Sequence, residues 1–333
     1  MKKTILIQLF LMGMLKGINA QDFHLSQVDA APHYFNPALT GIYLGEKADY
    51  RIYSDYRNQW RAFGVKPYST FYLGYDMSFK KQFGLGGYLI SNRNGAGGLN
   101  TIQFMPSGTY RITKDENGEH LLAVGAQMGI LYKSFDPNRY TYEKQFNPDA
   151  TEVFDQSISS GESFGKMNII KFDAAMGTFY KYNKSDWKAH PFLGYSVYHI
   201  SRPNQSLSGI QKDKLPMRWV YELGVDWKAN DQVNVKPMIL YMLTAKAHEL
   251  NIGATSSYLL KDTQYTLLGG LNYRTEDAFI IQLGMKYGPH IFMFSYDINT
   301  SNLNTYTNGR GGFEFSIVFT VIKGKALFNS RFK

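Results

Sequence analysis

Cysteine is absent from the 333 residues, so the chain must stay folded without disulfide bonds. Long hydrophobic runs are absent too. A transmembrane helix needs about eighteen uninterrupted apolar residues, and no window beyond the N-terminus approaches that length. The formal charge of +9 is modest, and the lysines and arginines are scattered without a compact basic run. Nucleic acid is therefore not an expected partner.

Motifs of common enzyme and metal sites are also absent. The sequence has no G-x-S-x-G, no H-E-x-x-H and no phosphate-binding glycine loop. The seven histidines are dispersed, and His24 and His33 make only a weak metal pair. We therefore expect no catalytic residue, no metal and no cofactor. A Ser-His-acid site assembled from distant strands stays open as an alternative.

The N-terminus has the three parts of a secretory signal peptide. Lys2 and Lys3 are positive, residues 5–15 are apolar, and residues 17–20 form a small-residue exit that predicts cleavage after Ala20. The apolar part is too short to cross a bilayer as a helix. No cysteine follows Ala20, which excludes a lipoprotein anchor. We expect a signal peptide at residues 1–20; a buried N-terminal helix is the alternative.

Alternating apolar and polar residues dominate the rest of the chain. Near the C-terminus, Phe292, Phe294 and Tyr296 fall on one side of an extended segment, and Ser295 and Asp297 fall on the other. Aromatic residues make up 16% of the sequence, although the mean hydropathy is below zero. A membrane β-barrel reconciles these facts, because only alternate residues of each strand meet lipid.

Fourteen segments are predicted as strands from this alternation and from flanking turn residues. Their centres are Tyr53, Leu73, Tyr88, Pro106, Gly125, Ala175, Gly194, Tyr221, Ile239, Ala254, Leu268, Leu283, Phe294 and Ile317. An even number suits a closed single-chain barrel, and about twelve or about sixteen strands are the alternatives. We expect an all-β, up-and-down antiparallel transmembrane barrel of about fourteen strands over residues 47–322.

The connections between the predicted strands alternate in length. If the first strand leaves the periplasm, the periplasmic turns are short and comprise 80–82, 115–118, 183–186, 229–231, 261–263 and 288–289. Three connections on the other side are long, namely 134–167, 201–215 and 299–310. This sorting is typical of outer-membrane barrels, so the sequence predicts the cell outer membrane as the location. The long loops after the fifth and thirteenth segments either contact carbohydrate or protein, or are merely solvated.

Residues 21–46 precede the first predicted strand and contain Pro32, Pro37 and Gly41, which interrupt helix and sheet. We interpret them as an irregular N-terminal periplasmic arm. A fourteen-strand barrel is wide enough to admit such an arm. The arm is therefore hypothesised to plug or line the periplasmic mouth. Residues 323–333 form a short C-terminal tail.

Charged residues lie on the face that the aromatic residues avoid. In the twelfth segment, for example, Leu283 faces outward and Gln282 inward. The mixed signs of the inner charges favour a lumen filled by ion pairs over a solute channel; these charges are Arg51, Arg57, Asp76, Lys171, Asp173, Arg218, Lys236, Arg274, Lys286 and Glu314. The glycines at 84, 86, 87 and 269–270 mark either bends in the wall or the approach of an inner segment, and bends are the favoured interpretation.

Two groups of motifs resemble the PorP/SprF family. The first comprises F-H-L-S-Q at 23–27, Y-F-N-P-A-L-T-G at 34–41 and Y-R-N-Q-W at 56–60. The second comprises S-Y-D-I-N-T-S-N-L at 295–303 and N-G-R-G-G-F-E-F-S at 308–316. The resemblance covers essentially the whole mature chain. The family's usual Ser-Gln-Tyr is Ser-Gln-Val here, which bears only on local contacts of the arm.

This resemblance implies a non-catalytic outer-membrane subunit of the type IX secretion system of Bacteroidetes, serving protein secretion or gliding motility. Its expected partners are a secreted cargo or surface adhesin, other type IX secretion components and outer-membrane lipid. The signature residues that we expect to shape those contacts are Phe23, Ser26, Gln27, Phe35, Asn36, Pro37, Asn58, Trp60, Asn308, Gly309, Arg310, Gly311 and Gly312. The alternative is a transporter of hydrophobic or small solutes, resembling the long-chain fatty-acid transporters and predicting an apolar inner pocket.

Overall fold

The computed structural model describes residues 23–42, 48–59, 67–80, 82–94, 98–113, 119–148, 153–162, 166–207, 213–302 and 304–322. The expected signal peptide at 1–20 and the expected tail at 323–333 lie outside these ranges, as do Trp60 and the predicted turn at 115–118. None of the helices in the described ranges is long and apolar enough to cross a bilayer.

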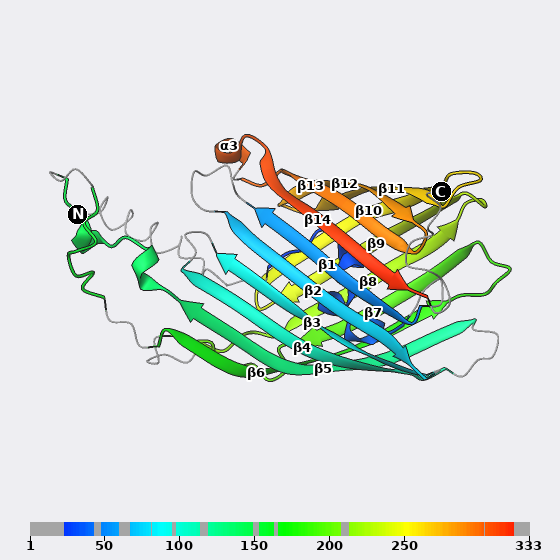
Figure 1. Ribbon diagram of the computed structural model, residues 1–333, viewed down its shortest axis with the longest axis horizontal. Helices are drawn as coiled ribbons and strands as arrows, with labels where there is room; N and C mark the ends of the chain where they lie inside the picture. The colour runs from blue at the N-terminus through cyan, green and yellow to red at the C-terminus, as the bar shows by residue number, and fades with distance from the viewer. Residues whose placement is uncertain are drawn as a thin grey trace, which may run out of the picture.

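Fourteen antiparallel strands close into one barrel, in which each strand pairs with its neighbours in the sequence and β1 pairs with β14 (Figure 1). The strands are β1 Tyr50–Gln59, β2 Tyr68–Phe79, β3 Phe83–Asn94, β4 Leu99–Arg111, β5 His120–Phe135, β6 Asn168–Tyr182, β7 Ala189–Tyr198, β8 Arg218–Lys228, β9 Val233–Thr244, β10 Ala247–Leu259, β11 Tyr265–Arg274, β12 Ala278–Tyr287, β13 His290–Asn299 and β14 Arg310–Val321. Every predicted centre falls inside its strand, so the predicted fold and strand number are confirmed.

Closure of the barrel depends on the pairing of the first and last strands. Tyr50 lies opposite Val321 and Gln59 lies opposite Gly312, so the two strands pair along the whole length of β1. In hydrocarbon an open sheet edge would leave backbone amides and carbonyls without partners. A closed ladder satisfies these groups within the protein.

The outer and inner faces of the wall follow the predicted alternation. Leu283 of β12 is 64% exposed on the outside, whereas its neighbour Gln282 is 5% exposed and faces the lumen. The same holds in β13, where Phe294 is exposed and Ser295 is buried. The exposed side chains form an apolar belt, which is the surface that a lipid bilayer requires.

The three longest connections lie at the same end of the barrel, as expected from the sequence. Short connections such as 80–82 and 288–289 gather at one end of the barrel, here called the turn end. The longest connections, 136–167, 199–217 and 300–309, gather at the other end, here called the loop end (Figure 1). These loops contain the short helices η4 Pro137–Arg139, η5 Glu143–Gln145 and α3 Asn304–Thr307.

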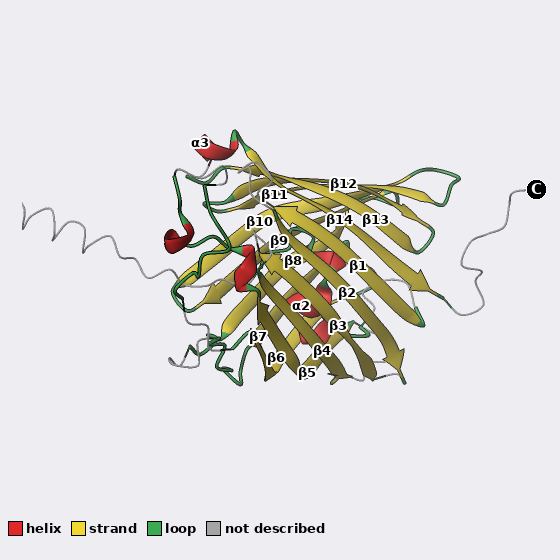
Figure 2. Cartoon of the chain, turned by 60° about the vertical axis from the view of Figure 1, so that its left-hand side comes forward, coloured by secondary structure: helices red, strands yellow, loops and turns green. Residues whose placement is uncertain are grey.

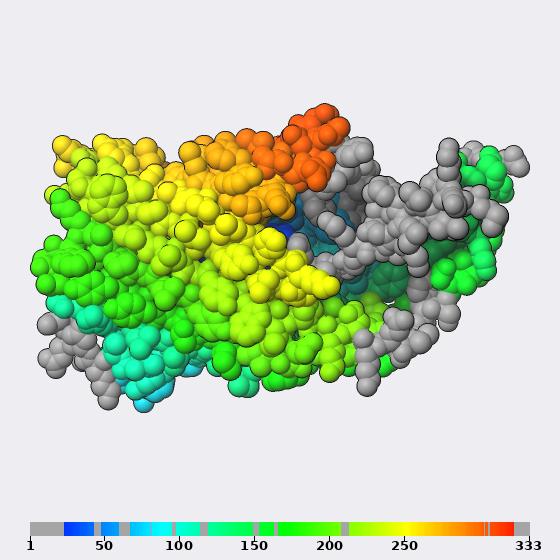
Figure 3. Space-filling view, turned by 180° about the vertical axis from the view of Figure 1, so that it is seen from behind, coloured from blue at the N-terminus to red at the C-terminus, as the bar shows by residue number. Residues whose placement is uncertain are grey.

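The described part of the arm lies inside the barrel. Its helical turns are η1 Val28–Ala30, α2 Pro32–Phe35 and η2 Pro37–Leu39, seen behind the strands in Figure 2. Dark blue atoms of the arm also show in a hollow toward the loop end (Figure 3). Tyr34 and Phe35 belong to the larger cluster of buried apolar side chains, so the arm supplies part of the core. The arm therefore lies deeper than the mouth at which the sequence placed it.

The lipid-facing belt generates a stability prediction. Replacing Leu283 with Arg places a charge near the middle of β12, so we expect the free energy of unfolding from lipid vesicles to fall by about 2–4 kcal/mol. The matched control is Ile158→Arg on the exposed loop after β5, for which we expect a change within about 0.5 kcal/mol. Urea titrations of both variants measure the difference. Equal effects would contradict a lipid-facing position of Leu283.

Candidate functional site: an arm held in the barrel lumen

A buried group of charges lies on the inner wall in the half of the barrel nearer the loop end. Arg57 Nη2 is 2.7 Å from Asp297 Oδ2, and Arg57 Nη1 is 3.0 Å from Glu314 Oε2. Arg274 Nη2 is also 2.7 Å from Asp297 Oδ2. We call these four residues the arginine–carboxylate cluster. Their side chains come from β1, β11, β13 and β14, which the closed barrel brings together.

The start of the arm is bonded directly to this cluster. The backbone amides of Ser26 and Gln27 each donate to Glu314, at 2.7 Å to Oε2 and Oε1 respectively. Ser26 Oγ donates to Asp297 Oδ1 at 2.9 Å and accepts from Arg57 Nη1 at 2.7 Å. Bonds between amides and an ionised carboxylate are stronger than neutral ones. The arm thus satisfies carboxylate oxygens that the two arginines only partly occupy.

The side chain of Gln27 extends the attachment along the wall. Its amide donates to Ser295 Oγ and to the carbonyl of Glu314, both at 3.1 Å. Its Oε1 accepts from Ser316 Oγ. The carbonyl of Ser26 accepts from Gln282 at 2.9 Å. The Ser26-Gln27 pair is therefore bonded to β12, β13 and β14 at once.

The cluster brings together motifs from both ends of the chain. Ser26 and Gln27 belong to the motif at 23–27, and Arg57 to the motif at 56–60. Asp297 and Glu314 lie in the two motifs near the C-terminus. Sequence reasoning named Ser26 and Gln27 as candidate interaction residues but not these three charged partners. The sequence could have identified them, because each is an inward-facing charged residue within one of the motifs given above.

Aromatic stacking holds the middle of the arm. The ring of Tyr34 stacks on Phe23 with 5.5 Å between centroids, and its hydroxyl donates to the Phe23 carbonyl at 2.8 Å. The Arg218 guanidinium lies 4.2 Å from the Tyr34 ring and 4.3 Å from the Tyr198 ring. It also donates to the Tyr34 carbonyl at 2.8 Å. A cation between two ring faces is a favourable, desolvated arrangement.

The Asn36-Pro37 segment packs against glycines of the wall. A Cβ on Gly125 would lie 2.5 Å from Pro37, and a Cβ on Gly177 would lie 2.3 Å from Asn36 Oδ1. The Phe35 carbonyl accepts from Ser196 Oγ at 2.6 Å, and the Pro37 carbonyl accepts from Thr109 Oγ1 at 2.8 Å. These contacts require backbone and wall to approach without an intervening side chain.

Gly84 shows the same close approach. A Cβ there would lie 2.0 Å from the Thr40 carbonyl oxygen, so the favoured interpretation of this glycine as a simple bend is wrong. The inner segment, which was the alternative, is what approaches it. For Gly86 and Gly87 the nearest atoms belong to the neighbouring strands.

His33 and Gly41 tie the second half of the arm to β2. The His33 ring is 2.9 Å from Tyr72 Oη and 3.2 Å from Asp76 Oδ2. Asp76 also accepts from Arg51 Nε at 2.9 Å and from the Gly41 amide at 2.9 Å. The sequence predicted that the inner charges compensate one another as ion pairs. The pairs of this segment and of the arginine–carboxylate cluster confirm that prediction for the charges they contain.

The remaining signature residues lie outside this network. Asn308 and Gly309 have φ values of 51° and 76° and form the turn that leads into β14, where Arg310 is the first residue. A Cβ on Gly311 would lie 2.3 Å from the Asp297 carbonyl, and one on Gly312 would lie 2.9 Å from the Asn58 carbonyl. The side chain of Asn58 donates to Tyr56 Oη at 3.3 Å. These residues shape the strands that carry the cluster.

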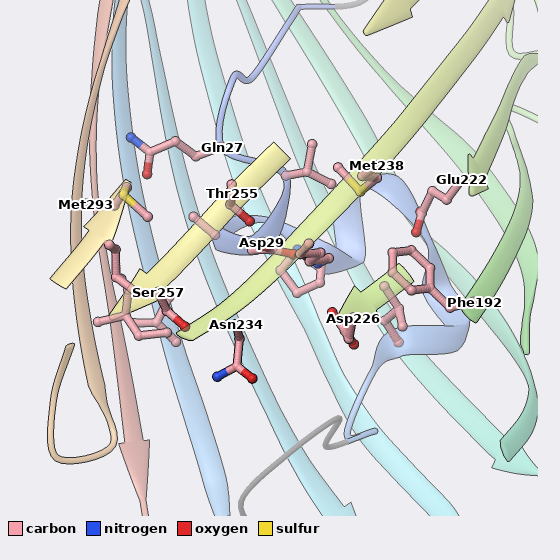
Figure 4. Close-up of a pocket in the computed structure, with 18 of the residues that line it drawn as sticks. Gln27, Asp29, Phe192, Glu222, Asp226, Asn234, Met238, Thr255, Ser257 and Met293 are labelled. Carbon is pink, nitrogen blue, oxygen red and sulfur yellow. The ribbon is translucent and has the colours of Figure 1, made fainter. Parts of the chain in front are cut away.

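A cavity of about 620 Å³ lies in the half of the lumen nearer the turn end (Figure 4). Its lining mixes apolar side chains such as Phe192 and Met238 with charged ones such as Glu222 and Lys236. The lining therefore differs from the purely apolar pocket that is expected of a hydrophobic-solute transporter. Within the described ranges no three His, Asp or Glu side chains converge as a metal site.

A serine and a histidine at the loop end share one carboxylate but are not arranged as a catalytic triad. His199 Nδ1 is 2.5 Å from Asp173 Oδ2, and Ser201 Oγ donates to Asp173 Oδ1 at 3.1 Å. In a Ser-His-acid triad the imidazole lies between the hydroxyl and the carboxylate. Here the carboxylate lies between the other two groups.

Comparison with known proteins places the chain in a family. The profile of the type IX secretion system membrane protein PorP/SprF family matches residues 18–319. The chain belongs to the PorP/SprF family. The resemblance expected from the arm and C-terminal motifs is thus confirmed, and with it an association with type IX secretion. No curated protein matched the sequence.

Solved structures similar to this PorP/SprF barrel include a toluene transporter and a FadL homologue. The toluene transporter TbuX of Ralstonia pickettii has a TM-score of 0.51 at 12% identity, covering 87% of this chain and 92% of TbuX. A FadL homologue of Pseudomonas aeruginosa has a TM-score of 0.46 at 10% identity, covering 85% of this chain and 91% of the homologue. At such identities the likeness to TbuX shows the fold alone. Family and fold together support an outer-membrane location.

The arginine–carboxylate cluster generates a prediction about the arm. Glu314→Gln removes the charge that two arm amides and Arg57 share, so we expect the free energy of unfolding to fall by about 1–3 kcal/mol. Hydrogen exchange of the amides at 23–42 should accelerate more than exchange in β7. Glu276→Gln, on an exposed turn, is the charge-matched control and should leave exchange in the arm unchanged. Arm exchange that is identical in both variants would argue against the cluster as the anchor.

Proposed function

We propose that this PorP/SprF protein is a non-catalytic outer-membrane subunit that aids the export or surface attachment of a partner cargo or adhesin. The observation that carries the proposal is the family match over residues 18–319. In this proposal the turn end faces the periplasm and the loop end faces outward, in keeping with the habit of outer-membrane barrels. Its partners within the membrane are other type IX secretion components. In cells that glide, the attached surface protein would be a gliding adhesin.

The filled lumen supports a role in protein contacts more than one in solute passage. The arm crosses from the β12–β14 wall, where Gln282 and Glu314 bond it, to the β4–β7 wall, where Thr109 and Ser196 bond it. A solute path would have to displace this buried segment. The hydrophobic-solute transporter is the second candidate, favoured by the fold that the chain shares with TbuX and disfavoured by the charged lining of the cavity.

The loop between β5 and β6 offers a surface for a partner. Phe146 and Phe154 contact each other with ring centroids 5.5 Å apart, and Phe146 remains 52% exposed. Val153 and Ile158 on the same loop are also exposed. Long aromatic loops on a rigid scaffold commonly carry binding function. In this proposal the loops contact cargo, whereas the buried signature residues Phe35, Asn36 and Pro37 position the arm.

Affinity purification tests the proposed function. We expect the tagged protein, purified from native membranes in mild detergent, to co-purify with secretion-system components or a large surface protein, identified by mass spectrometry. A tagged unrelated outer-membrane barrel of similar size is the control for non-specific capture. Recovery of the barrel with bound lipid or hydrocarbon and without protein partners would favour the transporter instead.

Removal of the arm tests whether it blocks the lumen. Deleting residues 23–41 takes away the segment that crosses the barrel, so we expect the single-channel conductance in planar bilayers to rise. Substituting Ile158→Arg on the outer loop serves as a control that leaves the lumen intact. The plug hypothesis fails if the deletion variant inserts as a folded barrel, seen by heat-modifiable migration, yet conducts no better than the full chain.

A further inference from the structure

Glu222 is a buried carboxylate in the wall of the cavity. It projects inward from β8 opposite Gly194 of β7 and is 4% exposed. Its Oε1 atom has no hydrogen-bond partner among the described residues. A carboxylate removed from water and left without a partner is costly, so such a group is normally completed by a donor or a cation.

The neighbouring lysines do not complete it, because each pairs with another carboxylate. Three lysines line the cavity, and their partners are Asp29 for Lys236, Asp226 for Lys181 and Asp231 for Lys228. These three pairs cancel in charge. Of the three carboxylates in the lining, Asp29 and Asp226 form ion pairs and Glu222 forms none with the described residues, so a positively charged ligand group would complement Glu222.

An aromatic surface lies on the same wall. Phe192 and Phe179 stack with 5.9 Å between ring centroids, and both line the cavity. The Lys236 ammonium lies 5.3 Å from the Phe192 ring centroid, so the aromatic pair borders a basic group of the lining. Long basic side chains combine an apolar stem with a charged end, which suits a ring next to a carboxylate.

The side of the cavity across from Glu222 is rich in hydrogen-bonding groups. Figure 4 shows Thr255 and Ser257 across the cavity from Glu222 and Phe192, with Asn234 below them. Amide and hydroxyl side chains both donate and accept, so they match the alternating groups of a peptide backbone. The cavity volume of about 620 Å³ lies within the range of small-ligand sites.

The lining of the cavity extends to the turn end. The lining includes Asn183, which follows β6, Lys228, the last residue of β8, and Asn234, the second residue of β9. All three lie where the strands meet the short turns. A ligand that enters here comes from the side that the proposed function assigns to the periplasm.

We propose that this cavity binds a short extended segment of polypeptide through a lysine or arginine side chain. The basic group pairs with Glu222 and its stem passes beside Phe192, while Asn234 and Thr255 bond the backbone of the segment. The choice of a polypeptide over a free amine rests on the proposed function, because a secretion subunit meets exported chains on this side.

Peptide binding to the full-length protein in detergent tests the proposal. The probes are fluorescent acetyl-Gly-Ser-Lys-Ser-Gly-amide and the same peptide with norleucine in place of lysine, followed by anisotropy. We expect the lysine peptide to bind at least about tenfold more tightly, as a charge-assisted bond implies. Glu222→Gln should abolish that difference. Glu276→Gln removes the same charge from an exposed turn between β11 and β12, outside the lining, and should preserve it.

Two further variants keep the test decisive. Phe192→Leu should weaken binding of the lysine peptide more than binding of the norleucine peptide. This variant replaces Glu222→Gln in the test if Glu222→Gln does not fold. Thr255→Val should weaken both peptides, with spermidine binding unchanged. The proposal is overturned if the lysine and norleucine peptides bind equally, or if Glu222→Gln binds the lysine peptide like the wild type. Spermidine binding as tightly as the lysine peptide would indicate a polyamine site instead.

The outcome is separable from that of the proposed function. If the tagged wild type captures secretion components but binds no lysine peptide, only the assignment of this cavity is wrong. If the lysine peptide binds as expected and no partner co-purifies, the cavity assignment stands as a peptide site and the secretion role needs another basis.

Discussion

Burial of charge in the lumen is the constraint on which this structure depends. The wall places Arg57, Arg274, Asp297 and Glu314 inside the barrel, away from bulk water. Ions removed from water are stable only when the charges and the remaining lone pairs find partners. The strands supply the opposite charges, and the arm supplies amides and a hydroxyl through Ser26 and Gln27. Arm and barrel are therefore parts of one folded unit.

The shape of the lumen follows from the same arrangement. Small residues at Gly84, Gly125 and Gly177 make room for the backbone of the arm. The arm occupies one part of the interior and leaves a cavity bounded by the arm and by strands including β8 to β10. That division gives the turn end a lined recess with a defined chemistry.

The sequence predicted the wall better than the interior. Alternation in strands such as β12, where Leu283 and Gln282 face opposite sides, was sufficient to place the predicted centres because a strand has a fixed period of two. The depth of the arm was not predictable in this way. Its bond from the Ser26 amide to Glu314 joins residues 288 positions apart, and their encounter depends on the closure and tilt of the whole barrel. The proposed role of Glu222 likewise depends on which lysines pair with the neighbouring carboxylates, and the alternation of residues along the strands does not show these pairings.

The most direct test of an arm packed within the barrel is a disulfide across their interface. The chain has no native cysteine, and Thr40 Oγ1 of the arm lies 2.8 Å from Ser107 Oγ of β4. The double variant Thr40→Cys, Ser107→Cys should therefore form an intramolecular bond on oxidation, detected as one cross-linked peptide by mass spectrometry under non-reducing conditions. Two free thiols that react with a water-soluble maleimide in the folded protein would contradict the position of the arm.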